Sequence, residues 1–206
     1  MSPEPVAAER TYRLLREQII IGAYKPGWPL NLQRLAEEFG ISVSPLRDAM
    51  HRLVGERIVE ALPVGGFQVG VPTAESLHDL YSWHDQLVRH AMTSPLSDSQ
   101  RRMLPTLTGA EITAEMLARA TTTLFAVLGD ASGNVEHREA IANASARLFR
   151  VRMTEQQIIK DVFPEFESLV AVSATGDAVS IRHAVWGYHR RRLRRAARLA
   201  AEITAG

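Results

Sequence analysis

The sequence predicts a mainly α-helical protein with a small N-terminal domain and a larger C-terminal bundle of antiparallel helices. Three observations lead to this prediction. Apolar residues recur at helical spacing along most of the chain. Short runs typical of strands are confined to residues 58–62 and 67–71. Directly after them, Thr73 offers a cap for a further helix. We therefore expect one domain over residues 1–72 and an all-helical domain over residues 73–206.

The first domain is expected to contain three helices. An amphipathic helix over residues 6–21 ends at Gly22. Two shorter helices follow, and each carries three apolar residues on one face: Leu32, Leu35 and Phe39 on one, and Leu46, Met50 and Leu53 on the other. Gly40 stands at the corner between them, where a residue able to adopt positive φ is needed. Ser44 can cap the second of these helices, and Pro45 suits its first turn.

The two predicted strands form a hairpin through the turn at residues 63–66. Two short helices, a tight turn between them and a following hairpin make up a winged helix-turn-helix. The second helix of such a unit enters the major groove of DNA, where its outward polar residues contact base edges and phosphates. The sequence thus predicts that residues 31–71 bind nucleic acid.

This segment resembles the winged helix-turn-helix of the GntR family of bacterial transcription regulators. The resemblance rests on four motifs in order between residues 9 and 71: REQIIIGAYKPGWPLN, LAEEFGIS, SPLRDAMHRL and IVEALPVGGFQV. It implies a homodimer whose two recognition helices read the half-sites of a short palindromic operator in double-stranded DNA. It also implies a C-terminal domain that binds a small-molecule effector and thereby changes the affinity for DNA.

We expect the DNA contacts to come from the second short helix and the wing: Ser42, Ser44, Pro45, Arg47, His51, Arg52 and Gly66. Gly66 would let the wing backbone approach the minor groove. The family usually carries an arginine after the serine that corresponds to Ser42 and another before the glycine that corresponds to Gly66. This chain has Val43 and Gly65 at these two positions, so both cations are missing. Each phosphate contact adds affinity by releasing counterions, so the loss of such contacts lowers affinity. Arg47 is retained and is therefore the strongest single candidate.

The second domain is predicted to contain six helices, at about residues 74–93, 97–107, 110–128, 135–151, 155–174 and 177–203. Segments rich in Gly, Pro, Asp and Ser separate them. Helices of this length form an antiparallel bundle, and bundles build ligand sites between their helices. A basic cluster at residues 190–198 is either a solvated helix face or a direct DNA contact.

This half resembles the FCD domain, the effector module of the FadR-like GntR subfamily, in the stretches LFAVLGDASGNVEHREAIANASARLFRVR and EFESLVAVSATGDAVSIRHAVWGYH. Such domains commonly hold a divalent metal through one Asp and three His. The Asp position corresponds to Thr121, and the first two His positions correspond to Phe125 and Phe166. The third His position falls on Tyr188, and the nearest histidine, His189, is one residue further along the chain. One imidazole and one hydroxyl do not bind a transition metal tightly, so we expect the FCD-type metal site to be lost and no cofactor to be present.

Aromatic residues occupy the place of that polar cage: Phe125, Phe166, Trp186 and Tyr188. The rings can simply fill the volume as core. Alternatively, they form a pocket for an apolar or aromatic effector, with Thr121 or His189 as its polar anchor. A third interpretation is a rearranged metal site at His84, His137 or His183, none of which is at ligand spacing with another.

Composition limits the functional classes. Hydrophobic residues make up 46% of the chain, which suits a packed globular protein. The absence of cysteine excludes disulfides, thiolate nucleophiles and cysteine-bound metals. No nucleophile elbow, HExxH pair or glycine-rich phosphate loop occurs, so we predict that the protein is not an enzyme. Without a long apolar run or a signal-peptide pattern, a cytoplasmic protein with no membrane partner is expected.

The sequence thus favours a dimeric, sequence-specific transcription regulator that responds to a small molecule, and such families mostly repress. The main alternative is a DNA-binding or architectural protein of the same fold without effector control. A third hypothesis is a ligand-binding protein whose winged domain no longer contacts DNA.

Overall fold

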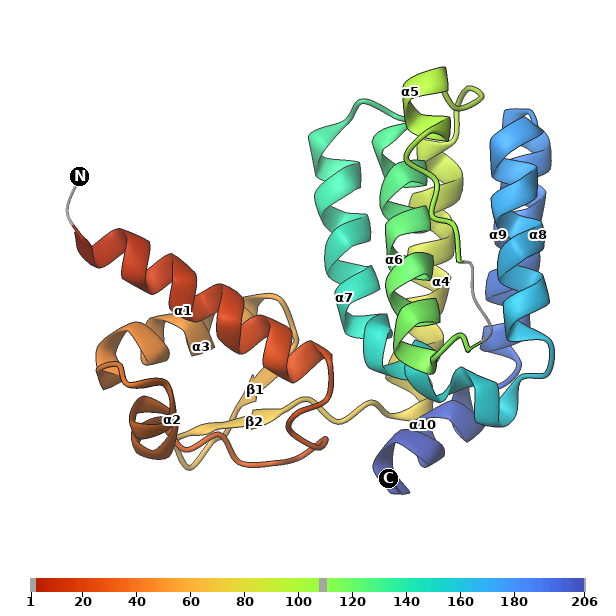
Figure 1. Ribbon diagram of the computed structural model, residues 1–206. Coiled ribbons are helices and arrows are strands. Elements are labelled where there is room, and N and C mark those ends of the chain that lie inside the picture. The colour runs from red at the N-terminus through yellow and green to blue at the C-terminus, as the bar shows by residue number, and fades with distance from the viewer. Residues whose placement is uncertain (1–2, 108–110, 206) are drawn as a thin grey trace. The chain divides into compact units, whose positions relative to one another are not determined.

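The computed structural model describes residues 3–107 and 111–205 (Figure 1). These residues form ten helices and two short strands, so the predicted mainly α fold is confirmed. The chain divides into two compact units, the first ending at Pro72 and the second comprising Thr73–Ala205. None of the described helices is long and apolar enough to cross a membrane.

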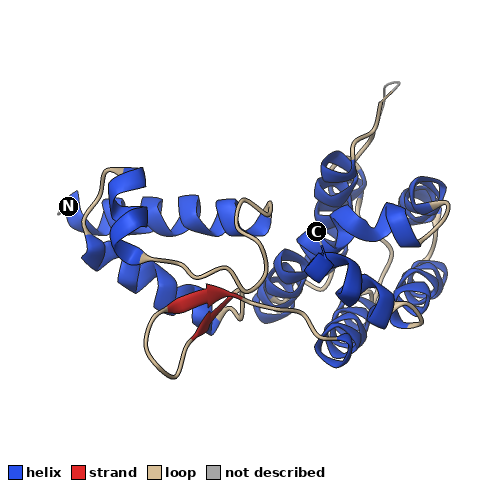
Figure 2. Cartoon of the chain, turned by 90° about the horizontal axis from the view of Figure 1, so that it is seen from below, coloured by secondary structure: helices blue, strands red, loops and turns tan. Residues whose placement is uncertain are grey.

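The first unit is a three-helix domain with a two-stranded wing. Its elements are α1 (Pro3–Ile20), α2 (Leu32–Phe39), α3 (Val43–Gly55), β1 (Val59–Ala61) and β2 (Phe67–Val69). The apolar face predicted for α3 is buried, and Leu15 of α1, Leu46 and Leu53 are fully enclosed. The strands, drawn as red arrows in Figure 2, pair antiparallel. Val59 lies opposite Val69.

The turn between α2 and α3 follows from local chain chemistry. Asn31 caps α2 by accepting a hydrogen bond from the backbone N–H of Arg34, 3.0 Å away. Gly40 ends α2 in the left-handed region at φ 64°, as predicted. The prediction that Ser44 caps α3 is wrong, because Ser42 occupies the N-cap position and Ser44 lies inside the first turn.

The second unit contains α4 (Ala74–Ala91), α5 (Asp98–Arg101), α6 (Ala114–Asp130), α7 (Val135–Ile158), α8 (Val162–Thr175), α9 (Ala178–Leu193) and α10 (Ala196–Ala205). The five long helices α4, α6, α7, α8 and α9 lie side by side, and α10 packs across the end of α4 and α7 (Figure 1). Thr73 begins α4 through a reciprocal capping box with Ser76. One continuous apolar core runs between these helices.

Three helix boundaries differ from the prediction. The segment predicted as a helix at 97–107 is helical only over α5, because Pro105 disfavours helical backbone in the residue before it. Helix α7 continues to Ile158, and the chain breaks instead at Asp161, which adopts φ 58°. The predicted last helix is divided into α9 and α10. Residue 110, the predicted start of one helix, lies outside the described residues.

Candidate nucleic-acid interface and buried polar cluster

The outward face of α3 is the candidate DNA-reading surface. The inward face is buried and consists of Leu46, Ala49, Met50 and Leu53. Ser44, Arg47 and His51 are exposed on the other side of the helix, while Pro45 is half-buried in its first turn. No described carboxylate forms an ion pair with Arg47, so its guanidinium is available for a phosphate or a base edge.

The side chain of Arg52 has a different environment from that of Arg47. Its guanidinium donates a 2.8 Å hydrogen bond to Glu9 and stacks 3.6 Å from the ring centroid of Tyr12. The hydrogen bond to Glu9 raises the pKa of Arg52. The structure therefore directs Arg52 toward α1, although the sequence placed it with the DNA contacts.

Helix α1 also forms hydrogen bonds with the residue that follows α3. Tyr12 and Arg16 both donate hydrogen bonds to the carboxylate of Glu56, which immediately follows α3, and the Arg16 bond measures 2.8 Å. On the opposite flank, the ring of His51 meets the edge of Phe67 in β2 at a centroid distance of 5.2 Å. The orientation of α3 is thus fixed by both α1 and the wing.

The wing turns through two glycines. Gly65 and Gly66 adopt φ values of 89° and 93°, which L-residues with side chains rarely adopt. An added β-carbon at either position would meet no other atom within 4 Å, so the requirement for glycine is conformational and the backbone is open to a partner. The residue at the tip is Val64, which is 95% exposed. The described wing turn therefore presents open backbone and an apolar side chain.

A chain of hydrogen bonds crosses the interior of the second unit. Nδ1 of His84 lies 2.8 Å from Nε2 of His189, and Nε2 of His84 lies 2.9 Å from Oγ of Ser145. Nδ1 of His189 donates to the carbonyl of Val185 at 2.7 Å, which leaves Nε2 of His189 as the acceptor from His84. All four ring nitrogens therefore have partners inside the protein.

Both histidines are uncharged in the folded state. Burial lowers the pKa of His189 to about 3. Burial, and then the neighbouring imidazole of His189 and the guanidinium of Arg152, hold the pKa of His84 well below its usual range. Asp85 lies 3.6 Å from Nδ1 of His189, but a neutral imidazole forms no ion pair with it.

Aromatic rings surround the two histidines. Phe125 packs against His84, Tyr188 and His189 at centroid distances of 4.7, 5.1 and 5.4 Å. The hydroxyl of Tyr188 is buried and has no hydrogen-bond partner among the described residues. Nε of Arg152, whose guanidinium lies 5.3 Å from the centre of the Phe125 ring, is also buried and finds no acceptor within residues 3–107 and 111–205. The cluster thus holds two buried donors that lack acceptors.

The structure separates the residues that the sequence grouped as an effector site. Thr121, Phe125, Phe166, Tyr188 and His189 are buried in the bundle. Trp186 is 38% exposed on the outer face of α9, where Arg190 stacks over it. Among the described residues, no three His, Asp or Glu side chains gather closely enough to hold a metal ion.

Arg190, Arg194 and Arg198 are exposed, as the interpretation of residues 190–198 as a solvated face expects, but Arg192 departs from it because it is fully buried. It donates to both carboxylate oxygens of Glu155, at 3.0 and 2.7 Å, and to Glu165 at 2.6 Å. Glu155 also accepts a 2.8 Å bond from the hydroxyl of Tyr81. This network joins α4, α7, α8 and α9. The sequence contained a signal for it, since Arg192 continues the buried face of Ile181, Val185 and His189 at helical spacing.

Acid is expected to destabilise the second unit, because both buried histidines are neutral when folded and bind protons on unfolding. Between an ordinary histidine pKa of about 6.5 and the folded value of about 3 for His189, the unfolded state binds more protons. The free energy of unfolding should therefore fall as pH drops from 7 to 5, with a slope that approaches about 1.4 kcal/mol per pH unit for each histidine below the unfolded pKa, and stay nearly level with respect to these groups above pH 7.

Urea unfolding of the full chain at several pH values measures this dependence. His189→Gln should show a shallower dependence between pH 7 and 5, whereas His78→Gln, at an exposed position, should follow the parent protein. His84→Gln provides a second test in case the first variant does not fold. Equal slopes in all folded variants would contradict the assignment of neutral buried histidines.

Comparison with known proteins supports the nature of the first unit. Residues 7–69 match the family model described as bacterial regulatory proteins, gntR family. An uncharacterized HTH-type transcriptional regulator, YdhC of Bacillus subtilis (strain 168), is 30% identical over 96 residues, which are 47% of this chain and 43% of that protein. The HTH-type transcriptional repressor GlaR of Escherichia coli (strain K12) is 33% identical over 70 residues, 34% of this chain and 32% of that protein.

The matched segments thus span less than half the length of these two regulators. A solved structure, E. coli McbR/YncC, matches 93% of this chain and 97% of its own with a TM-score of 0.70 and 20% sequence identity. At this identity the likeness shows a shared fold.

Proposed function

We propose that this chain, whose N-terminal unit is a helix-turn-helix domain of the gntR family, is a sequence-specific DNA-binding transcription regulator that acts as a dimeric repressor. The observation that supports this most directly is the exposed face of α3, on which Arg47 forms no ion pair with any described residue. One of the similar regulators is named a repressor, which favours repression as the mode of action.

Fluorescence anisotropy with DNA from the upstream region of the protein's own gene tests this function. A scrambled duplex serves as the control, and both are titrated across a salt series. A preference for the native duplex that persists at physiological salt supports specific regulation. Equal affinity for both duplexes that disappears as salt rises supports instead the alternative of an architectural protein that binds without sequence preference.

The missing cations of the interface motivate a substitution that should strengthen binding. Val43 is the first residue of α3, where the family usually carries an arginine. Val43→Arg is expected to raise operator affinity at low salt and to steepen the slope of log K against log salt by about 0.9. Leu14→Arg adds the same charge on an exposed part of α1 and is the control. Identical slopes for both variants would show that Val43 does not face a phosphate.

We further propose that the bundle binds a small effector with an apolar or aromatic body and an acceptor oxygen. The unpaired hydroxyl of Tyr188 and the unpaired Nε of Arg152 support this, because buried donors without acceptors are costly and a ligand oxygen would satisfy them. His189, an anchor suggested by the sequence, already uses both ring nitrogens. In place of His189, we propose Tyr188 and Arg152 as the polar anchors of the effector.

We also propose that the effector site works without a metal. The donor set argues for this: the two buried imidazoles of His84 and His189 point their nitrogens at each other and at Ser145 and Val185. No imidazole lone pair is left to coordinate an ion at this place. The positions that would complete an FCD-type site hold Thr121, Phe125 and Phe166.

A further inference from the structure

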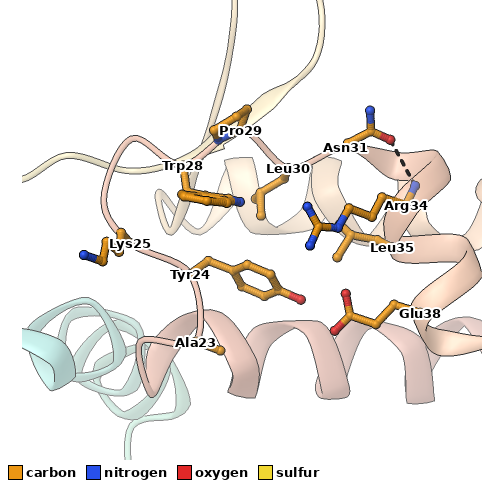
Figure 3. A pocket seen from close by; sticks show the side chains of 10 residues that line it. All are labelled: Ala23, Tyr24, Lys25, Trp28, Pro29, Leu30, Asn31, Arg34, Leu35 and Glu38. Atoms are coloured by element: carbon orange, nitrogen blue, oxygen red, sulfur yellow. Dashed lines mark hydrogen bonds between the residues drawn. The ribbon is translucent and has the colours of Figure 1, made fainter.

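A cavity of about 610 Å³ lies in the first unit, between the loop after α1 and helix α2 (Figure 3). This volume is typical of sites that hold a small molecule. The cavity is formed entirely by residues of the DNA-binding unit, so it is separate from the buried cluster of the bundle.

Two aromatic side chains border the open space. Trp28 lies on one side and Tyr24 on the other (Figure 3). Trp28 is 48% exposed, although a ring of this size is normally packed into a core. Two rings that border an accessible slot provide stacking surfaces for a flat ligand, and base–aromatic stacking contributes substantially to nucleotide binding.

Two side chains of opposite charge lie at one end of the cavity. Arg34 and Glu38 are one turn apart on α2, and both side chains reach the cavity beside the hydroxyl of Tyr24 (Figure 3). Burial, and then the charge and hydrogen bonding of Glu38, raise the pKa of Tyr24. Neither Arg34 nor Glu38 forms an ion pair within the described chain. Lys25 lies at the other end of the cavity (Figure 3).

This arrangement selects a particular ligand edge. A carboxylate accepts two parallel N–H bonds, while a guanidinium donates to an oxygen. Guanine presents N1–H and the N2 amino group beside O6 on one edge. Adenine has one amino donor beside a bare ring nitrogen, and so it cannot donate twice to Glu38. The ammonium group of Lys25, at the opposite end, matches a phosphate.

We propose that the cavity binds a guanine nucleotide. The base stacks between Trp28 and Tyr24 with its Watson–Crick edge at Glu38 and Arg34, and the phosphate lies toward Lys25. Because α2 packs against α3 in the same small unit, the nucleotide occupies a site next to the DNA-reading helix. The inference goes beyond the proposed function and does not require DNA to be tested.

The test uses the full chain with Trp83→Phe and Trp186→Phe. Both tryptophans are exposed in the second unit, so Trp28 remains as the single tryptophan of the protein. Titration with GMP should quench its fluorescence with saturation. AMP should bind at least about tenfold more weakly, because one carboxylate oxygen would lose its donor.

A matched pair of variants on α2 then identifies the contact. Glu38→Gln should weaken GMP binding about tenfold, because an amide accepts only one of the two hydrogen bonds. Glu37→Gln changes a carboxylate one position away that does not line the cavity, and it should bind GMP like the parent. Circular dichroism confirms that both variants are folded.

Three results would overturn the proposal: no saturable quenching by GMP, equal affinity for AMP and GMP, or equal effects of the two substitutions. None of them would affect the proposed regulator function, since no DNA is present in these measurements. Conversely, a protein that fails to recognise its operator can still bind GMP as proposed.

Discussion

Replacing Arg47 by alanine is expected to lower operator affinity by about one to two orders of magnitude. Arg47 is exposed on the outward face of α3 and makes no ion pair with a described residue, so its removal should leave the fold intact. Anisotropy with the native and scrambled duplexes gives the affinity, and thermal unfolding gives the stability. The loss should be larger for the native duplex if Arg47 reads a base edge.

Arg10→Ala is the matched control. It removes the same charge from an exposed position on α1, outside α3. A general loss of attraction for DNA would weaken both variants equally. If Arg47→Ala retains as much operator affinity as Arg10→Ala, α3 does not read DNA through this residue.

Arg192→Met is expected to lower the free energy of unfolding by about 3–5 kcal/mol. The substitution leaves the carboxylate of Glu155 buried without the cation that compensates its charge. Chemical denaturation at pH 7 measures the effect. Arg198→Met, at an exposed position of α10, should change the stability by no more than about 0.5 kcal/mol.

A double variant separates the charge from the packing. Combining Arg192→Met with Glu155→Gln removes both buried charges, and it should be more stable than Arg192→Met alone. If Arg192→Met costs no more than Arg198→Met, the network does not support the bundle in solution.

Local signals in the sequence were sufficient for most of the first unit. Leu46, Met50 and Leu53 lie at helical spacing, and all three are buried as that spacing predicts. The start of α3 was harder to predict, because Ser42 and Ser44 are both good capping residues and stand two positions apart. The helix begins after Ser42, whose side chain makes no capping bond, so propensity alone did not identify the cap.

The buried polar cluster depends on contacts that no local pattern contains. His84 and His189 are 105 positions apart, and Glu155 and Arg192 are 37 apart. Their meeting follows from how α4, α7 and α9 pack, which periodicity does not determine. The aromatic replacements at Phe125 and Tyr188 were visible in the sequence, and the structure brings these two rings together. Trp186 is also aromatic, and the sequence grouped it with these rings, but its side chain faces outward.

The hydrogen bonds that Glu9 and Glu56 accept bear on the thermodynamics of DNA recognition. They fasten α3 to α1 before any DNA is present. A helix that is already ordered loses little conformational entropy when it docks on DNA, so the free energy of the contacts is offset only slightly by the ordering of α3. The heat capacity change of binding should then reflect only the surface that protein and DNA remove from water, without the additional decrease in heat capacity that accompanies the folding of a disordered arm.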